Sequence, residues 1–138
     1  MNAYVDSSVV LRTVFGEKDT IKLPKALKQL VASELLRVEC FRTIDRMRLG
    51  LAISDEDISE RRALLYKAMR SIRFVKLGAP ILDRACQPFP TTLKTLDAIH
   101  LSTALLWQKQ EGEELAFLTH DEQLGRSARA MNFEVIGC

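Results

Sequence analysis

Residues 3–15 read AYVDSSVVLRTVF, an apolar run that stops at one acid and resumes as a second apolar pattern. The first three residues suit a short buried strand, and the apolar spacing over 7–15 predicts a helix that Asp6 or Ser7 caps. A strand that leads directly into a helix is typical of parallel α/β folds. The stretch therefore predicts an α/β fold with an acid at the end of its first strand.

The rest of the chain continues this alternation. Apolar runs and helical spacing predict strands at 30–33, 74–77, 115–119 and 133–136, and helices at 34–49, 55–71, 80–86, 95–110 and 121–131. The helix at 95–110 is expected to be capped by Thr95. Because parallel strands need long right-handed crossovers, we expect one domain over residues 1–138, with a central parallel sheet of four or five strands and helices on both faces.

The composition fits an ordinary globular protein. Hydrophobic residues make up 47% and charged residues 28%, and the net charge of +2 is too small to indicate nucleic-acid binding by itself. The three cysteines are widely spaced and form no CxxC pair, so no disulfide framework or zinc site is indicated. No stretch approaches the ~18 apolar residues of a membrane span, and no signal peptide pattern opens the chain, so we expect a cytoplasmic protein.

Four acids stand where strands or helices can direct them into one cleft: Asp6, Glu39, Asp97 and Asp121. Asp6 directly follows one predicted strand and Asp121 follows another by two residues, so both emerge at the carboxyl edge of the sheet, where such folds bind ligands. Gathered carboxylates repel one another unless cations lie between them, which indicates Mg²⁺, with Mn²⁺ as a substitute. A divalent pair held by acids, without a protein nucleophile, can cleave a phosphodiester with water.

Each acid also has an ordinary structural explanation. Asp6 and Asp121 stand where helix caps stand, and Asp97 lies in the first turn of a helix, where the helix dipole favours a carboxylate. Glu34 and Glu39 share one predicted helix and point about 140° away from each other, so only one of them can face a shared site. The residues alone leave that choice open.

Other functional classes fit the chain less well. A nucleotide-binding module needs a glycine-rich turn after its first strand, and a haloacid-dehalogenase-like phosphatase needs a second Asp where Ser8 stands. Asp97 and His100 have the spacing of a carboxylate–histidine metal pair, but the chain holds no second such pair, so His100 is expected to pack beside the pocket. The alternative that stays open is a scaffold that binds protein or RNA without catalysis.

Four segments follow one another in a recognisable order and spacing: YVDSSVVLRTVFGE (4–17), VASELLRVECFR (31–42), LDAIHLSTAL (96–105) and FLTHDEQLGRSARAMNFEVI (117–136). They resemble the PIN-domain family of ribonucleases, specifically the VapC-type toxins of bacterial and archaeal toxin–antitoxin pairs. The resemblance covers essentially the whole chain. It implies a single PIN domain, folded as a three-layer α/β/α sandwich.

The resemblance also implies an activity and its partners. The expected activity is that of a Mg²⁺-dependent endoribonuclease, which hydrolyses RNA phosphodiester bonds with a metal-activated water. The expected partners are a second copy of the chain, in a homodimer, and a small VapB-type antitoxin that blocks the acidic pocket. The acids that match the catalytic and metal-binding positions are Asp6, Glu39, Asp97 and Asp121, which selects Glu39 over Glu34.

Three further residues receive expected roles. Ser8 and Thr119 are expected to orient a ligand water or a carboxylate by hydrogen bonds, although both positions also suit local caps. Arg42 lies one turn from Glu39 and is the cation expected to contact the RNA backbone.

Overall fold

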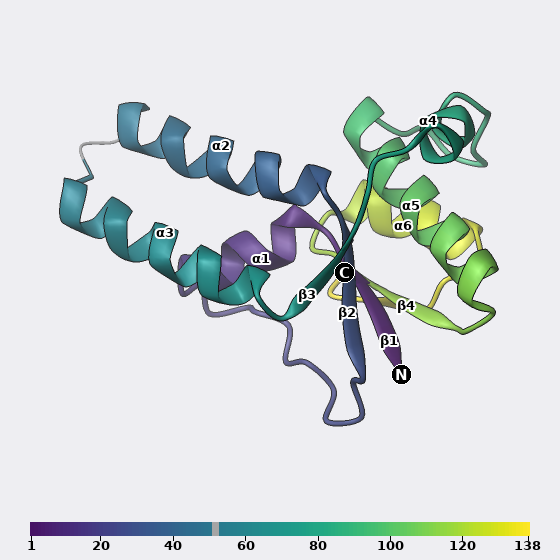
Figure 1. Ribbon diagram of the computed structural model, residues 1–138, viewed down its shortest axis with the longest axis horizontal. Helices are drawn as coiled ribbons and strands as arrows, with labels where there is room; N and C mark the ends of the chain where they lie inside the picture. The colour runs from purple at the N-terminus through teal and green to yellow at the C-terminus, as the bar shows by residue number, and fades with distance from the viewer. Residues whose placement is uncertain (51–52) are drawn as a thin grey trace.

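A computed structural model describes residues 1–50 and 53–138, in which strands and helices alternate (Figure 1). The strands are β1 (Asn2–Val5), β2 (Gln29–Ser33), β3 (Ile72–Val75), β4 (Leu115–Leu118) and β5 (Val135–Ile136). The helices are α1 (Ser7–Val14), α2 (Leu35–Gly50), α3 (Asp55–Met69), α4 (Ala79–Ala85), α5 (Thr95–Glu111) and α6 (Glu122–Ala130). Every predicted element is present, and each end lies within two residues of the predicted one.

The five strands form one sheet in the order β3-β2-β1-β4-β5, and all neighbouring pairs are parallel. The chain runs outward from β1 through β2 to β3, and then crosses to β4 on the other side of β1. The strand order therefore reverses between β1 and β4, which is where open parallel sheets bind ligands. Val5 is paired with Leu118 at this point, so the residues that follow the two strands lie side by side.

Helices cover both faces of the sheet (Figure 1). Ala3 and Val5 pack into a core with buried residues of α1, α2 and α3, whereas Tyr4 packs on the opposite face with buried residues of α5 and α6. Successive residues of a strand point to opposite faces, and both faces here meet apolar helices, so most strand residues are apolar. The predicted three-layer α/β/α sandwich is confirmed.

Helix starts place several polar groups at the carboxyl edge of the sheet. Asp6 is the N-cap of α1 and Asp121 is the N-cap of α6, as their positions after strands predicted. The predicted cap of α5 is wrong: Thr95 is the first helical residue, and Lys94 takes the cap position without a side-chain hydrogen bond. In the part of the chain that the structure describes, no helix has the length and apolar character needed to cross a bilayer.

Candidate active site

A hollow of about 320 Å³ opens where β1 and β4 end, and all four predicted acids line it. They come from four separate elements: Asp6 follows β1, Glu39 lies on α2, Asp97 lies in the first turn of α5, and Asp121 caps α6. The fold thus brings together carboxylates that are far apart in the sequence.

Asp6 forms the floor of this hollow and is held by three hydrogen bonds. Its Oδ1 accepts from Ser8 Oγ at 2.6 Å and from the Val9 amide at 3.3 Å, and its Oδ2 accepts from Thr119 Oγ1 at 2.6 Å. Only 4% of the residue is exposed, and this burial raises the pKa of the Asp6 carboxyl above its ordinary value despite the hydrogen bonds, which lower it. A nearby cation would offset that loss of solvation.

The hydroxyls of Ser8 and Thr119 tie the end of β1 to the turn after β4. Each donates to Asp6, and each also accepts a backbone N–H from that turn: Ser8 Oγ from His120, and Thr119 Oγ1 from Asp121, both at 3.0 Å. Since each hydroxyl has a donor and an acceptor partner, the orientation of the Asp6 carboxylate is fixed. The two residues therefore lie where the sequence predicted an orienting role.

Glu39 enters the hollow from α2 and meets a buried histidine. Its Oε1 is hydrogen-bonded to His100 Nε2, and His100 Nδ1 lies 2.7 Å from the hydroxyl of Tyr4. The Tyr4 hydroxyl also accepts from the Ser33 amide at 3.2 Å. His100 packs beside the pocket as predicted, but its contacts with Glu39 and Tyr4 were not foreseen, because they join residues from three elements.

Asp97 and Asp121 both line the hollow and lie close enough for their charges to interact. Burial, followed by the charge of Asp121, raises the pKa of the half-buried Asp97 carboxyl to about 6. Asp6 and Glu39 add to this repulsion, while His100 opposes it. Asp121 is in turn oriented by its cap, in which Oδ1 accepts from the Leu124 amide at 2.9 Å. The burial and negative neighbours that raise the pKa of Asp97 make an environment that a divalent cation stabilises.

This donor set fits a hard divalent cation. Carboxylate oxygens are the ligands that Mg²⁺ and Mn²⁺ prefer, and both ions retain water that can bridge to more distant ligands. Among the described residues, no three His, Cys, Asp or Glu side chains already stand as a ligand cluster. In the structure, both Asp6 oxygens accept from hydroxyls, and Glu39 is turned to His100. A cation bound here would therefore need side-chain rotation or bridging waters to complete its coordination shell.

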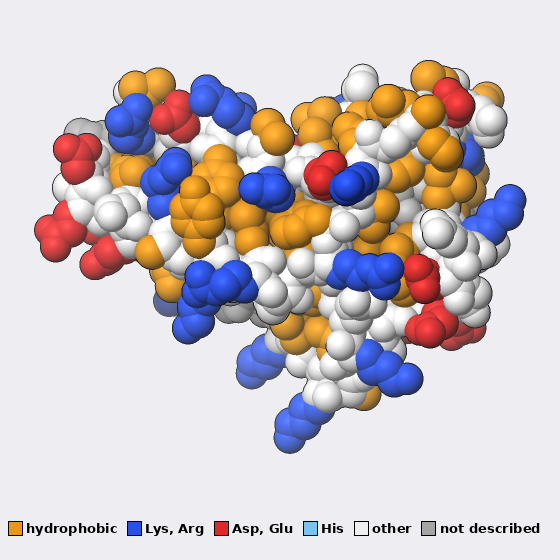
Figure 2. All heavy atoms as spheres, in the orientation of Figure 1, with side chains coloured by type: hydrophobic (Ala, Val, Ile, Leu, Met, Phe, Trp, Pro, Cys, Tyr) orange, Lys and Arg blue, Asp and Glu red, His pale blue; other side chains and the backbone are white. Residues whose placement is uncertain are grey.

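Lys94 is the one cationic side chain among the residues that line the hollow, and the sequence reasoning did not select it. The structure does not bring the predicted Arg42 there: its side chain is 63% exposed, and it bonds Asp45 Oδ2 at 3.1 Å. Arg42 and Glu34 instead line a separate, more apolar hollow on α2. On the face of the molecule that Figure 2 shows, Lys and Arg side chains are dispersed rather than gathered in one patch.

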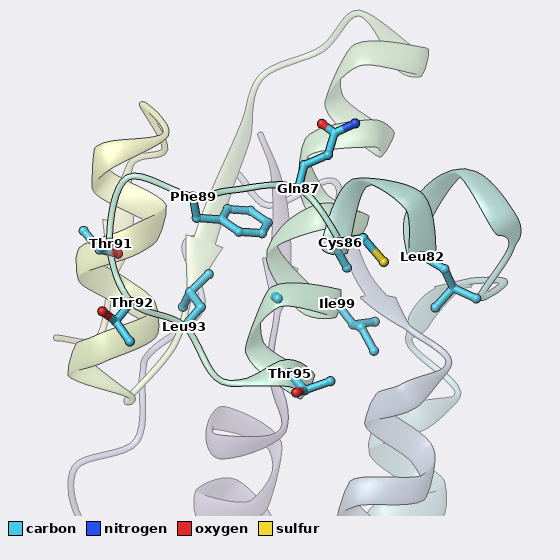
Figure 3. Close-up of a pocket in the computed structure, with 11 residues that line it drawn as sticks. Leu82, Cys86, Gln87, Phe89, Thr91, Thr92, Leu93, Thr95 and Ile99 are labelled. Carbon is cyan, nitrogen blue, oxygen red and sulfur yellow. The ribbon is translucent and has the colours of Figure 1, made fainter.

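A larger cavity of about 500 Å³ adjoins the acidic hollow and shares Thr95 with it. It lies between α4, α5 and the loop that joins them, with Leu82, Phe89 and Ile99 among its walls (Figure 3). No carboxylate lines this cavity. Chemistry at a phosphodiester needs charged groups, so we assign the candidate active site to the smaller, acidic hollow.

Comparisons with known proteins agree with this fold and show the family. A family model described as PIN domain matches residues 3–130. The chain is 30% identical over 137 residues to a protein named Ribonuclease VapC46 from Mycobacterium tuberculosis, and the match covers 96% of this chain and 95% of that protein.

Solved structures share the architecture at low sequence identity. VapBC2 from Rickettsia felis, bound to a DNA fragment from its promoter, superposes with a TM-score of 0.69 at 10% identity, covering 99% of this chain and 98% of that one. A toxin-antitoxin complex from Klebsiella pneumoniae gives a TM-score of 0.63 at 17% identity, covering 97% and 95%. At these identities the likeness establishes the fold.

Proposed function

The chain belongs to the PIN-domain family, and we propose that it is a Mg²⁺-dependent endoribonuclease, the toxin of a VapBC-type toxin–antitoxin pair. The single observation that carries the proposal is the hollow at the carboxyl ends of β1 and β4, which four carboxylates from four elements line together. Kinship with a protein named as a ribonuclease supports RNA as the substrate.

The four acids would have different roles in binding the cation. Asp6, Glu39 and Asp97 would hold one Mg²⁺, directly or through water, with Mn²⁺ as a substitute, and Asp121 completes the acidic wall. When bound, such an ion lowers the pKa of a coordinated water and neutralises charge on the phosphate. Ser8 and Thr119 keep the Asp6 carboxylate in one orientation through their hydrogen bonds.

RNA must reach the acids although both carry negative charge. Lys94 lies at the wall of the hollow, where its ammonium group can pair with a phosphate beside the scissile bond. Arg42 lies one turn beyond Glu39 on the exposed side of α2 and can contact the backbone further along the strand. A single-stranded or looped RNA suits this hollow, because its backbone is accessible to groups set at the sheet edge.

The partners of the pair follow from kinship. A VapB-type antitoxin would silence the enzyme by covering the acidic hollow, and a homodimer is the expected state of the toxin. Two solved structures that share this fold are toxin–antitoxin complexes, which supports an antitoxin as the partner of this chain.

Metal removal tests the proposed activity directly. Purified protein, freed of any partner, is expected to cleave single-stranded RNA in Mg²⁺, to lose that activity in EDTA, and to regain it when excess Mg²⁺ or Mn²⁺ is restored. Cleavage that continues in EDTA would refute the metal-dependent mechanism. Folded protein that binds RNA but never cleaves it would favour a binding scaffold instead.

A further inference from the structure

Glu39 has the longest side chain among the four acids of the hollow. Asp6 is fixed by two hydroxyls and an amide, and Asp121 is fixed by the cap of α6. A glutamate has one more rotatable bond than an aspartate and loses more entropy when it is ordered. Among the described residues, the one hydrogen-bond partner of the Glu39 carboxylate is His100 Nε2. The direction in which Glu39 points therefore depends on that histidine.

The hydrogen-bond partners on the two sides of His100 indicate which of its nitrogens carries the proton. The Tyr4 oxygen accepts from the Ser33 amide at 3.2 Å, which leaves its own proton free to be donated to His100 Nδ1 at 2.7 Å. An ionised Glu39 can only accept a hydrogen bond. In the neutral imidazole, Nδ1 is then the acceptor and Nε2–H is the donor to Glu39.

His100 and its partner Tyr4 are buried in the centre of the fold. Only 1% of His100 and none of Tyr4 is exposed, and the Tyr4 ring stacks on Phe117 with centroids 5.0 Å apart. Tyr4 lies on β1, the middle strand of the sheet, between β2 and β4. A ring packed at this place cannot swing away without opening the core, so its donor group has a fixed position.

We propose that His100 is a positioning residue, which donates its Nε2–H to one oxygen of Glu39 and so leaves the other oxygen directed at the cation. This role rests on the proposed function, because it assigns Glu39 to a metal site. Removing a residue that orients a metal-binding carboxylate typically lowers metal affinity by roughly 10- to 100-fold. A histidine that merely filled the core would affect stability without a specific effect on metal binding.

Two substitutions separate these roles. His100→Gln places an amide N–H near the position of Nε2, so it retains a donor for Glu39. His100→Asn places its amide near the position of Nδ1, so it retains a partner for Tyr4 and leaves Glu39 without one. Ser102→Ala is the matched control, since Ser102 is fully buried on the same helix, its hydroxyl has no partner among the described residues, and it does not line the hollow.

The experiment measures Mn²⁺ binding by calorimetry and the tautomer of His100 by ¹⁵N NMR of the metal-free protein. We expect the Nε2–H tautomer in the wild type, wild-type Mn²⁺ affinity in Ser102→Ala, near wild-type affinity in His100→Gln, and at least ~10-fold weaker binding in His100→Asn. Circular dichroism checks that each variant is folded.

Three results would overturn the proposal: an Nδ1–H tautomer in the wild type, equal Mn²⁺ affinities in the two His100 variants, or no Mn²⁺ binding by the wild type. The NMR measurement uses the wild type alone, so an Nδ1–H tautomer would overturn the proposal even where a variant fails to fold. Neither readout uses RNA. A wild type that binds Mn²⁺ through the Nε2–H arrangement but cleaves no RNA would refute the nuclease function and leave the role of His100 intact.

Discussion

Thr119 Oγ1 donates a hydrogen bond of 2.6 Å to Asp6 Oδ2, and so joins the residues that follow β4 and β1 at the point where the strand order reverses. Thr119 is fully buried and Asp6 is 4% exposed. A carboxylate in such surroundings depends on protein donors in place of water. The stability of the fold and the geometry of the candidate site are therefore coupled through one hydroxyl.

Thr119→Val should destabilise the metal-free protein by about 1 to 3 kcal/mol. Valine preserves the shape of the side chain but removes the donor to Asp6 and the acceptor for the Asp121 amide. Urea denaturation at pH 7, in EDTA, measures the difference. A valine variant as stable as the wild type would show that the hydroxyl does not stabilise the buried carboxylate.

Asp97→Asn should stabilise the metal-free protein at pH 7.5 and have little effect at pH 4. The folded-state pKa of Asp97, about 6, lies above the ordinary value of 3.8, so the folded protein holds this proton more tightly than the unfolded chain. The wild type therefore loses stability as pH rises from about 4 through 6, by on the order of 1 kcal/mol for a half-buried group. Thermal unfolding in EDTA at both pH values tests this; an advantage for Asn that appears only at pH 4 would contradict it.

Glu39→Gln should weaken Mn²⁺ binding at least ~10-fold, whereas Glu34→Gln should not. Glu39 lines the acidic hollow, while Glu34 lies at a separate hollow and accepts from the Leu77 amide at 3.3 Å. The two acids are neighbours in sequence and receive the same substitution, so each controls for the other. Calorimetry of both variants gives the affinities. A larger loss in Glu34→Gln would move the metal site to the other side of α2.

Lys94→Ala should raise KM for RNA more than Arg42→Ala. Lys94 lines the hollow, whereas the Arg42 guanidinium is largely exposed and already bonds Asp45. Exposed charge pairs are screened by salt and contribute little. Cleavage kinetics at two salt concentrations measure both variants. A larger rise in KM for Arg42→Ala than for Lys94→Ala would instead show that Arg42, the cation predicted from the sequence, makes the main phosphate contact.

The sequence was sufficient for the fold because periodicity and strand-end position are local signals. The apolar run before Asp6 and the alternation that follows predicted every strand and helix, and the placement of Asp6 and Asp121 followed from the parallel sheet. Helix rotation showed that only one of Glu34 and Glu39 could face the shared site. The choice of Glu39 needed the family resemblance.

The rest of the site depends on contacts between elements that no local pattern encodes. The bonds from His100 to Glu39 and Tyr4 join α5, α2 and β1. Arg42 is one turn from Glu39 along the helix, but its guanidinium pairs with Asp45, one turn further on, and its side chain is 63% exposed. Lys94 gave no signal because its position is set by the loop that precedes α5.

The most direct test of a metal-dependent carboxylate site is RNA cleavage in Mg²⁺ by the wild type, Asp97→Asn and Asp45→Asn. Asp97 lines the hollow, whereas Asp45 lies on the exposed side of α2 and pairs with Arg42 and Arg48. Circular dichroism verifies that all three proteins are folded. We expect Asp97→Asn to lower kcat by at least ~100-fold, which exceeds the usual effect of losing a residue that only orients a metal ligand. We expect Asp45→Asn to retain wild-type activity. Wild-type cleavage by Asp97→Asn would contradict the account.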